Sequence, residues 1–218
     1  MRATEIVDYL NEIIPDPKCE LNYNKDYELV IATMLSAQTT DKRVNEITEI
    51  LFNKYPSLND LKNADLDDLK RIIRPLGSYN KKASNIIDIA SKLDEVGFVP
   101  NDRIFLESLN GVGRKTANVV LGELFHENVV AVDTHVERVS KRIGIANDND
   151  SVLDVEVKLN KFFKGYDLFK IHHQLLLFGR YHCTARNPKC KECKFKCGNR
   201  NWFYSFFIIK CILFNYWF

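Results

Sequence analysis

Long apolar segments are absent from the first 201 residues of this 218-residue chain. In particular, there is no window of about 20 apolar residues of the kind that crosses a membrane. The first 14 residues, MRATEIVDYLNEII, lack the apolar core of a signal peptide and have the spacing of an amphipathic helix. We therefore expect no membrane association.

Cysteine is scarce over most of the chain, where Cys19 is the only one before residue 183. This excludes a disulfide framework for the bulk of the protein. Four of the other five cysteines follow the spacing C-x6-C-x2-C-x3-C: Cys183, Cys190, Cys193 and Cys197. Four thiols in so short a segment indicate a metal site in a reducing cytosol. Zinc and a [4Fe–4S] cluster both accept four thiolates; the spacing alone slightly favours zinc, and an empty site is the third alternative.

An excess of either charge is missing from the whole chain, whose net charge of +2 indicates no partner. The basic residues are unevenly placed, however. Between positions 180 and 200 there are seven of them and only one acidic residue, Glu192. The seven are Arg180, Arg186, Lys189, Lys191, Lys194, Lys196 and Arg200. This segment is typical of a surface that binds phosphates, and a solvated charged loop is the alternative.

The period-two alternation of a half-buried strand is also absent, and VVAV at 129–132 is too short for a sheet. Apolar residues recur instead at helical spacing in about ten segments. These segments are 6–14, 27–35, 44–51, 66–73, 86–93, 104–109, 116–125, 134–143, 152–162 and 168–178. The pattern predicts an all-α fold, in which we expect Asp41 to cap the third helix.

A tight connection between two predicted helices carries two glycines, in LNGVGRKTANVV at 109–120. Gly111 and Gly113 allow positive φ and close backbone approach, so the turn suits an anion beside the helix N-terminus; a simple packing corner is the alternative. Lys115 lies in the first turn of the second helix, where the macrodipole disfavours a cation. That position, beside Arg114, favours the neutral and nucleophilic amine, and a solvated lysine that contacts phosphate is the alternative.

The segment AVDTHVERV places a carboxylate between an apolar run and a helix. Thr134 and Glu137 fit a capping box, and Asp133 fits equally well as the N-cap. Asp133 is therefore either a cap alone or an ionised carboxylate that faces developing positive charge.

Together, LNGVGRKTANVVL and AVDTH resemble the helix-hairpin-helix signature and catalytic aspartate of the endonuclease III family of DNA glycosylases. Three further segments match in the same order, namely LSAQTTD at 35–41, GSYNKKASNI at 77–86 and FGRYHCTARNPKC at 178–190. The resemblance covers residues 1 to about 197.

This resemblance implies a bifunctional enzyme that removes oxidised pyrimidines from damaged double-stranded DNA and cuts the strand by β-elimination. Lys115 would attack the sugar C1′, displace the base and form a Schiff base, while Asp133 would stabilise the cationic sugar. Two alternatives stay open. One is a non-catalytic hairpin protein that binds DNA backbone, and the other is an adenine-type monofunctional glycosylase, against which Lys115 argues.

The resemblance also implies a set of DNA contacts. Gln38 matches the residue that fills the gap left by a flipped base, and a polar residue at a helix end is the alternative. Ser78 stands where the family has an apolar wedge, so Tyr79 is the candidate to stack on bases. The other predicted contacts are in the hairpin and the cysteine segment: Gly111, Gly113, Arg114, Arg186, Lys189 and Lys191.

For the cysteines, the resemblance reverses the preference for zinc, because the family carries a [4Fe–4S] cluster there. The last spacing is three residues here and five in the family.

The implied architecture has a six-helix barrel at 20–127, with residues 1–19 and 128–197 in a cluster domain across a DNA cleft. We expect a monomer, in the cytoplasm and associated with the nucleoid if the source is bacterial.

The composition changes sharply at Trp202. Nine of the 17 residues from 202 to 218 are aromatic, and Lys210 is the only charged one. The resemblance stops after Cys197, and residues 198–218 form an atypical hydrophobic tail. We interpret this tail as translation out of frame; a hydrophobic extension and a dimer contact are the alternatives.

Overall fold

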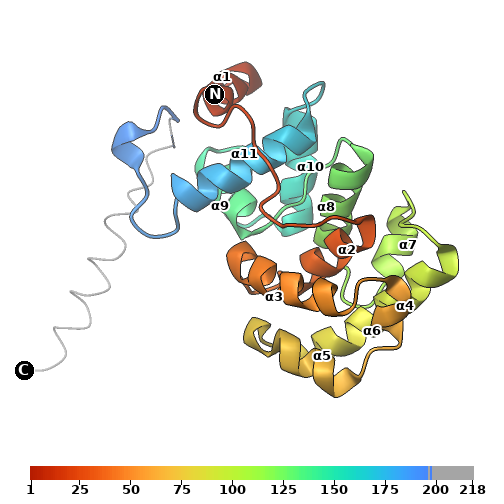
Figure 1. The fold of residues 1–218 in the computed structure, drawn as a ribbon. Coiled ribbons are helices and arrows are strands. Elements are labelled where there is room, and N and C mark those ends of the chain that lie inside the picture. The colour runs from red at the N-terminus through yellow and green to blue at the C-terminus, as the bar shows by residue number, and fades with distance from the viewer. Residues whose placement is uncertain (196, 198–218) are drawn as a thin grey trace, which may run out of the picture.

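The computed structural model describes residues 1–195 and 197; the predicted hydrophobic tail lies outside them. This part of the chain is all helical, with eleven α-helices, two short 3-10 helices and no strand (Figure 1). The α-helices are α1 (Ala3–Ile13), α2 (Asp26–Leu35), α3 (Asp41–Lys54), α4 (Leu58–Lys62), α5 (Leu66–Ile73), α6 (Tyr79–Val96), α7 (Arg103–Ser108), α8 (Arg114–Phe125), α9 (Thr134–Arg142), α10 (Val152–Phe162) and α11 (Leu168–Tyr181). The 3-10 helices are Arg74–Leu76 and Cys190–Glu192. The predicted all-α fold is confirmed.

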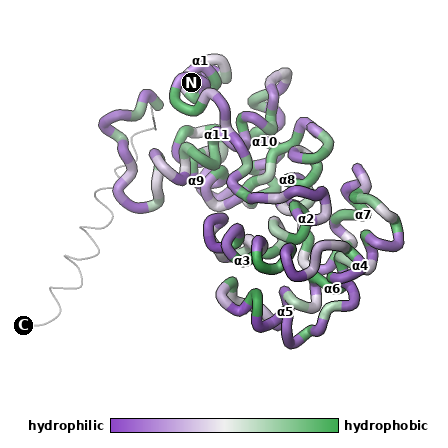
Figure 2. The backbone as a smooth tube through the Cα atoms, viewed as in Figure 1, coloured by the Kyte–Doolittle hydropathy of each residue, from purple (hydrophilic) through white to green (hydrophobic). Residues whose placement is uncertain are grey.

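Two separate hydrophobic cores organise the helices. The first core takes its buried residues from positions 21–121, and α2 lies inside it, with every residue from Glu28 to Leu35 buried. Figure 2 shows α2 as hydrophobic along most of its length. The second core combines Ile6, Tyr9 and Leu10 of α1 with residues from 130–195. Figure 1 shows the result, with α1 packed beside α11 at the other end of the chain.

The two cores draw on residues 21–121 and on residues 6–10 and 130–195, and the barrel and cluster domains stay a prediction. Whether each part folds as a unit stays a prediction.

Ion pairs cross between the two cores. Arg180 of α11 pairs with Glu20 of the segment before α2 and with Asp41 of α3, whose Oδ2 lies 2.7 Å from the guanidinium. Arg114 of α8 pairs with Glu156 of α10 at 2.8 Å. These ion pairs hold the two cores in place against each other.

Two local expectations were wrong. Asp41 does not cap α3, because the side chain of Thr40 accepts the hydrogen bond from the Arg43 amide, and Asp41 pairs with Arg180 instead. The short helix α4 was also missed. Its N-cap, Ser57, accepts from the Asp60 amide, but five residues are too few to show a helical apolar period.

None of the helices within the described residues is long and apolar enough to cross a membrane.

Candidate active site

The hairpin joins α7 to α8 through Leu109–Gly113, and its two glycines do different work. Gly111 has φ of +84°, and a Cβ there would overlap the Asn85 amide nitrogen and lie 3.1 Å from Met34 Cγ. Gly113 is the N-cap of α8 with φ of −97°, and a Cβ there would meet no atom within 4 Å. Gly111 therefore uses the positive φ that glycine allows, whereas Gly113 is extended and leaves its backbone open to close approach.

Lys115 follows this turn as the second residue of α8, and its side chain is exposed. It lines a small pocket between the two cores together with Asp133. Lys18 and Cys19 from the segment that connects the cores line the same pocket, as does His172 of α11. The structure thus brings the predicted nucleophile and the predicted carboxylate to one cavity.

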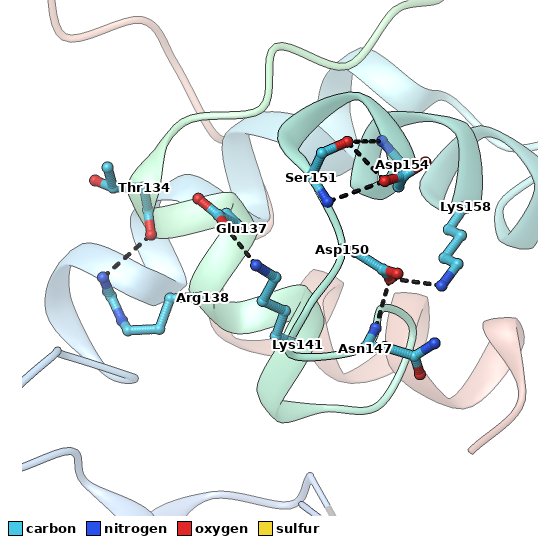
Figure 3. A network of polar contacts seen from close by, with 9 residues as sticks. All are labelled: Thr134, Glu137, Arg138, Lys141, Asn147, Asp150, Ser151, Asp154 and Lys158. Atoms are coloured by element: carbon cyan, nitrogen blue, oxygen red, sulfur yellow. Dashed lines mark hydrogen bonds and ion pairs between the residues drawn. The ribbon is translucent and has the colours of Figure 1, made fainter.

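Asp133 is the N-cap of α9. Its Oδ1 accepts from the amides of His135 at 2.9 Å and Val136 at 2.8 Å. The capping box expected from Thr134 and Glu137 is not formed, because Glu137 pairs with Lys141 at 2.6 Å, one turn further along α9 (Figure 3). Two amide donors hold the Asp133 carboxylate at the pocket with one oxygen engaged.

One residue that lines the pocket, His172, is a buried histidine that carries no charge. Burial, with the neighbouring His173 and Lys115, holds the pKa of His172 well below its usual range. His172 is therefore a neutral imidazole at physiological pH. Burial also raises the pKa of the Cys19 thiol to about 12, an effect increased by Glu123. Cys19 is consequently not a competing nucleophile at neutral pH.

A larger cavity of about 740 Å³ lies next to this pocket and shares Lys18, Cys19, Leu21 and His173 with it. Neither Lys115 nor Asp133 lines the larger cavity. Lys115 and Asp133 both line the smaller pocket, so the predicted catalytic residues are at that pocket and not at the larger one.

Gln38 lies on the turn after α2, whereas Ser78 and Tyr79 are at the start of α6, all in the first part of the chain. Gln38 is exposed with φ of +60°, and Ser78 is exposed with φ of +46° as the N-cap of α6. A left-handed conformation is uncommon outside glycine, and such strained positions cluster at functional sites. Tyr79 is half-buried and packs against the first core, so part of its ring is already committed to the fold.

Arg114 makes a contact that the sequence did not indicate. Its Nε and Nη2 donate to the two carboxylate oxygens of Glu156 at 2.9 and 2.8 Å. The Glu156 side chain is 9% exposed and that of Arg114 is 50% exposed. This bidentate pair holds the start of α8, one residue before Lys115, against the second core.

The cysteine segment follows α11. Cys183 is buried in the second core, Cys190 and Cys197 are exposed, and Cys193 is half-buried. Burial raises the pKa of both Cys193 and Cys197, and the charges of the other cysteines of the segment raise it further. The four thiols are thus near enough to influence one another electrostatically.

Arg142 of α9 binds the start of this segment through its guanidinium. Its Nη1 lies 3.3 Å from Cys183 Sγ and donates to the carbonyl of Thr184 at 2.7 Å, while Nη2 donates to that of Ala185 at 3.3 Å. Four cysteine sulfurs in one segment are a donor set that zinc and [4Fe–4S] clusters accept. The donor chemistry therefore suits a metal centre, although no three His, Cys, Asp or Glu side chains in residues 1–195 and 197 are grouped as a metal site.

The basic patch is smaller than its sequence suggests. Arg180 is paired with Glu20 and Asp41, and Lys194 is paired with Glu12 at 2.6 Å. The predicted DNA contacts of this segment, Arg186, Lys189 and Lys191, are all exposed. Lys196 and Arg200 lie outside the described residues.

Comparison with known proteins identifies the family. A model described as HhH-GPD superfamily base excision DNA repair protein matches residues 31–164. The chain is also 46% identical over 189 residues to endonuclease III of Bacillus subtilis (strain 168), with 86% of each chain covered. The chain belongs to the endonuclease III family.

Solved structures agree with this membership. The structure of a non-covalent endonuclease III–DNA complex has a TM-score of 0.83 at 44% identity, covering 88% of this chain and 91% of that one. A trapped endonuclease III–DNA covalent intermediate has a TM-score of 0.82 at 43% identity, covering 89% and 94%. The all-helical fold of this endonuclease III family member is thus shared with proteins solved on DNA.

Sequence reasoning missed several residues of the site. Glu156, Arg142 and His172 each come from a helix far from the motif that it supports. The sequence shows Glu156 only as an acidic residue between apolar neighbours. No local pattern predicts that it pairs with Arg114. His172 is buried, and no motif in the sequence places it at the pocket.

Proposed function

We propose that this chain is a bifunctional DNA glycosylase and AP lyase that removes oxidised pyrimidines from damaged double-stranded DNA. The observation that carries the proposal is the meeting of Lys115 and Asp133 at one pocket between the two cores. Membership of the endonuclease III family supports it, as does the similar endonuclease III that was solved as a covalent intermediate with DNA.

The hairpin is the proposed anchor for the DNA backbone. The Gly113 backbone is open at the N-terminus of α8, where amide groups attract a phosphate. Arg186, Lys189 and Lys191 add positive charge on the cysteine segment, and Arg114 positions the start of α8 through Glu156. These contacts hold the duplex while one nucleotide rotates out of the stack at a cost of a few kcal/mol.

Gln38 and the Ser78–Tyr79 pair are the proposed probes of the duplex. Gln38 would fill the space that the flipped base leaves, since it is exposed on a turn where its φ is +60°. Ser78 occupies the wedge position with a hydroxyl, so the exposed part of Tyr79 is left to stack on a base.

The chemical steps follow from the pocket. The Lys115 amine attacks C1′ of the sugar, forming a C–N bond while the glycosidic bond breaks and its electron pair leaves with the base. The Asp133 carboxylate, fixed by two amides, stabilises the positive charge that develops on the sugar. The C1′–O4′ bond then breaks as nitrogen forms a C=N bond to C1′, and the proton that nitrogen loses is taken up at O4′, which gives the Schiff base. Transfer of a C2′ proton to a base then forms a C2′=C3′ bond, breaks the C3′–O bond and expels the 3′ phosphate, which cuts the strand.

We also propose that Cys183, Cys190, Cys193 and Cys197 hold a [4Fe–4S] cluster, with zinc as the less favoured occupant. The cluster would brace the basic segment; it has no part in the excision steps. Protein truncated after Arg200 and purified anaerobically should contain about four irons per molecule, as one cluster requires. Stoichiometric zinc without iron would contradict this assignment.

Borohydride trapping tests the main proposal, because only a Schiff-base enzyme becomes covalently linked to DNA. Lys115→Gln should abolish trapping and strand cleavage and leave binding to an abasic duplex largely intact. Lys18→Gln is the matched control, since Lys18 lines the same pocket, and it should still trap. If trapping persists in Lys115→Gln and disappears in Lys18→Gln, the nucleophile is Lys18, and the assignment to Lys115 is contradicted.

A further inference from the structure

Lys82 of α6 is a buried lysine that the proposed mechanism does not use. Its side chain enters the first core, and the residue is only 6% exposed. The ammonium donates to three carbonyl oxygens: Leu35 at 2.9 Å, Ala37 at 3.0 Å and Leu76 at 3.0 Å. Because an ammonium has three protons, every donor of Lys82 has a partner.

The three carbonyls belong to two separate turns. Leu35 is the last residue of α2 and Ala37 lies two residues beyond it, whereas Leu76 ends the 3-10 helix before α6. A cation is favoured at the end of α2, where the carbonyls of the last turn have no helical partner. Burial lowers the pKa of Lys82, and the carbonyls compensate for the lost hydration of its charge.

Each turn leads directly into one of the proposed DNA probes. Ala37 precedes Gln38, and two residues after Leu76 comes Ser78; both Gln38 and Ser78 are exposed and left-handed. Thr39 adds a second tie between the turns, because its Oγ1 donates to the same Leu76 carbonyl at 2.9 Å. The strained backbone of the two probes is thus held by one shared cluster of donors.

We infer that Lys82 is a positioning residue for duplex opening, which fixes the Gln38 turn and the Ser78 turn at a set separation. The inference rests on the proposed function. Lys82 itself touches no DNA, because its ammonium is fully engaged inside the first core. Its contribution lies in the expulsion of a paired base, the step that needs Gln38 and Ser78–Tyr79 together.

A pair of substrates separates this role from simple stability. One duplex carries an oxidised pyrimidine opposite adenine, and the other carries a preformed abasic site, where no base has to be expelled. For Lys82→Met, we expect single-turnover excision of the paired lesion to fall about 10- to 100-fold, as misplaced groups cause. Cleavage at the abasic site should change by less than about 2-fold, since Lys115 and Asp133 are untouched. Lys81→Met, an exposed neighbour on the same helix, is the control and should match wild type on both substrates.

A readout independent of activity is hydrogen exchange. Amides of residues 36–40 and 76–79 should exchange faster in Lys82→Met and not in Lys81→Met. If Lys82→Met does not fold, Thr39→Val decides, with the same selectivity expected at about 3-fold, the effect of one neutral hydrogen bond. An equal loss on both substrates, or no loss on the paired lesion, would overturn the inference. Wild-type protein inactive on both duplexes would instead reject the proposed function.

Discussion

The hairpin and the cysteine segment are both short motifs, but the fold supports them in different ways. The hairpin is fixed by contacts within the chain, with Gly111 against Asn85 and Met34, and Arg114 against Glu156. The cysteine segment rests on Arg142 and on Phe195, whose ring packs edge-on against Tyr9 with centroids 4.9 Å apart. Its thiols lie near one another without forming a coordination group among the described residues.

This difference separates two kinds of site. A site that uses backbone and buried side chains is complete once the chain has folded. A site made of thiols is completed by the metal, whose binding free energy is part of the stability of its segment. Changes in the hairpin should therefore affect a folded unit directly, while changes near the cysteines should act partly through metal content.

The largest effect is expected from Gly111→Ala. Alanine at this position would have to keep the left-handed backbone φ, and its Cβ would overlap Asn85. We therefore expect a loss of about 3 kcal/mol in the free energy of unfolding. Gly113→Ala is the matched control, because that position is extended with open space around it; as an N-cap it favours glycine over alanine, so the loss should be no more than about 1 kcal/mol. Urea denaturation measures both. Equal stability of the two variants would contradict the division of roles between the glycines.

Arg142→Met should be next in size. It leaves the carbonyls of Thr184 and Ala185 without their donor, which costs about 2 kcal/mol. It also removes the cation beside Cys183, so iron per molecule should fall together with the melting temperature. Unchanged iron content with normal stability would show that Arg142 does not support the segment.

Glu156→Gln sharpens the comparison from the hairpin side. The bidentate pair with Arg114 is half exposed, so its loss should cost about 1 kcal/mol. Iron content should stay at the wild-type value, because the pair supports the start of α8 and not the cysteines. Loss of iron in this variant would mean that the two regions are coupled.

The smallest effect concerns the α9–α10 turn in Figure 3. Lys158 and the Asn147 amide hold the pKa of Asp150 below its usual range, and Ser151 lowers that of Asp154. A carboxyl with a depressed pKa stabilises the fold above its unfolded pKa and loses that contribution as pH falls through the folded one. The melting temperature should therefore decline slightly more on acidification in wild type than in Asp150→Asn. A steeper decline in the variant would reverse the sign of this contribution.

The sequence was sufficient where the determinants are local. Apolar spacing predicted the all-α fold, and α5 ends at Ile73, as the proline at position 75 indicates. The hairpin, Lys115 and Asp133 were all found from short motifs. Local rules failed where two cap residues compete, as at Thr40 and Asp41, because the choice depends on Arg180 from a distant helix.

Contacts between the cores were beyond local reasoning. Glu156 and His172 are brought to their places by the packing of helices that are far apart in sequence. Their partners follow from the tertiary arrangement, which a periodic pattern does not contain. The motif therefore predicted the nucleophilic lysine, and only the structure shows that Glu156 holds the start of its helix through Arg114.

Peptide mapping of the borohydride-trapped wild-type adduct tests the central claim most directly. Digestion of the complex formed on a duplex with an oxidised pyrimidine, followed by mass spectrometry, locates the amine that bonded to the sugar. The account predicts a single modified peptide that carries the sugar remnant on Lys115. Modification of Lys18 or of another amine, with Lys115 unmodified, would contradict it.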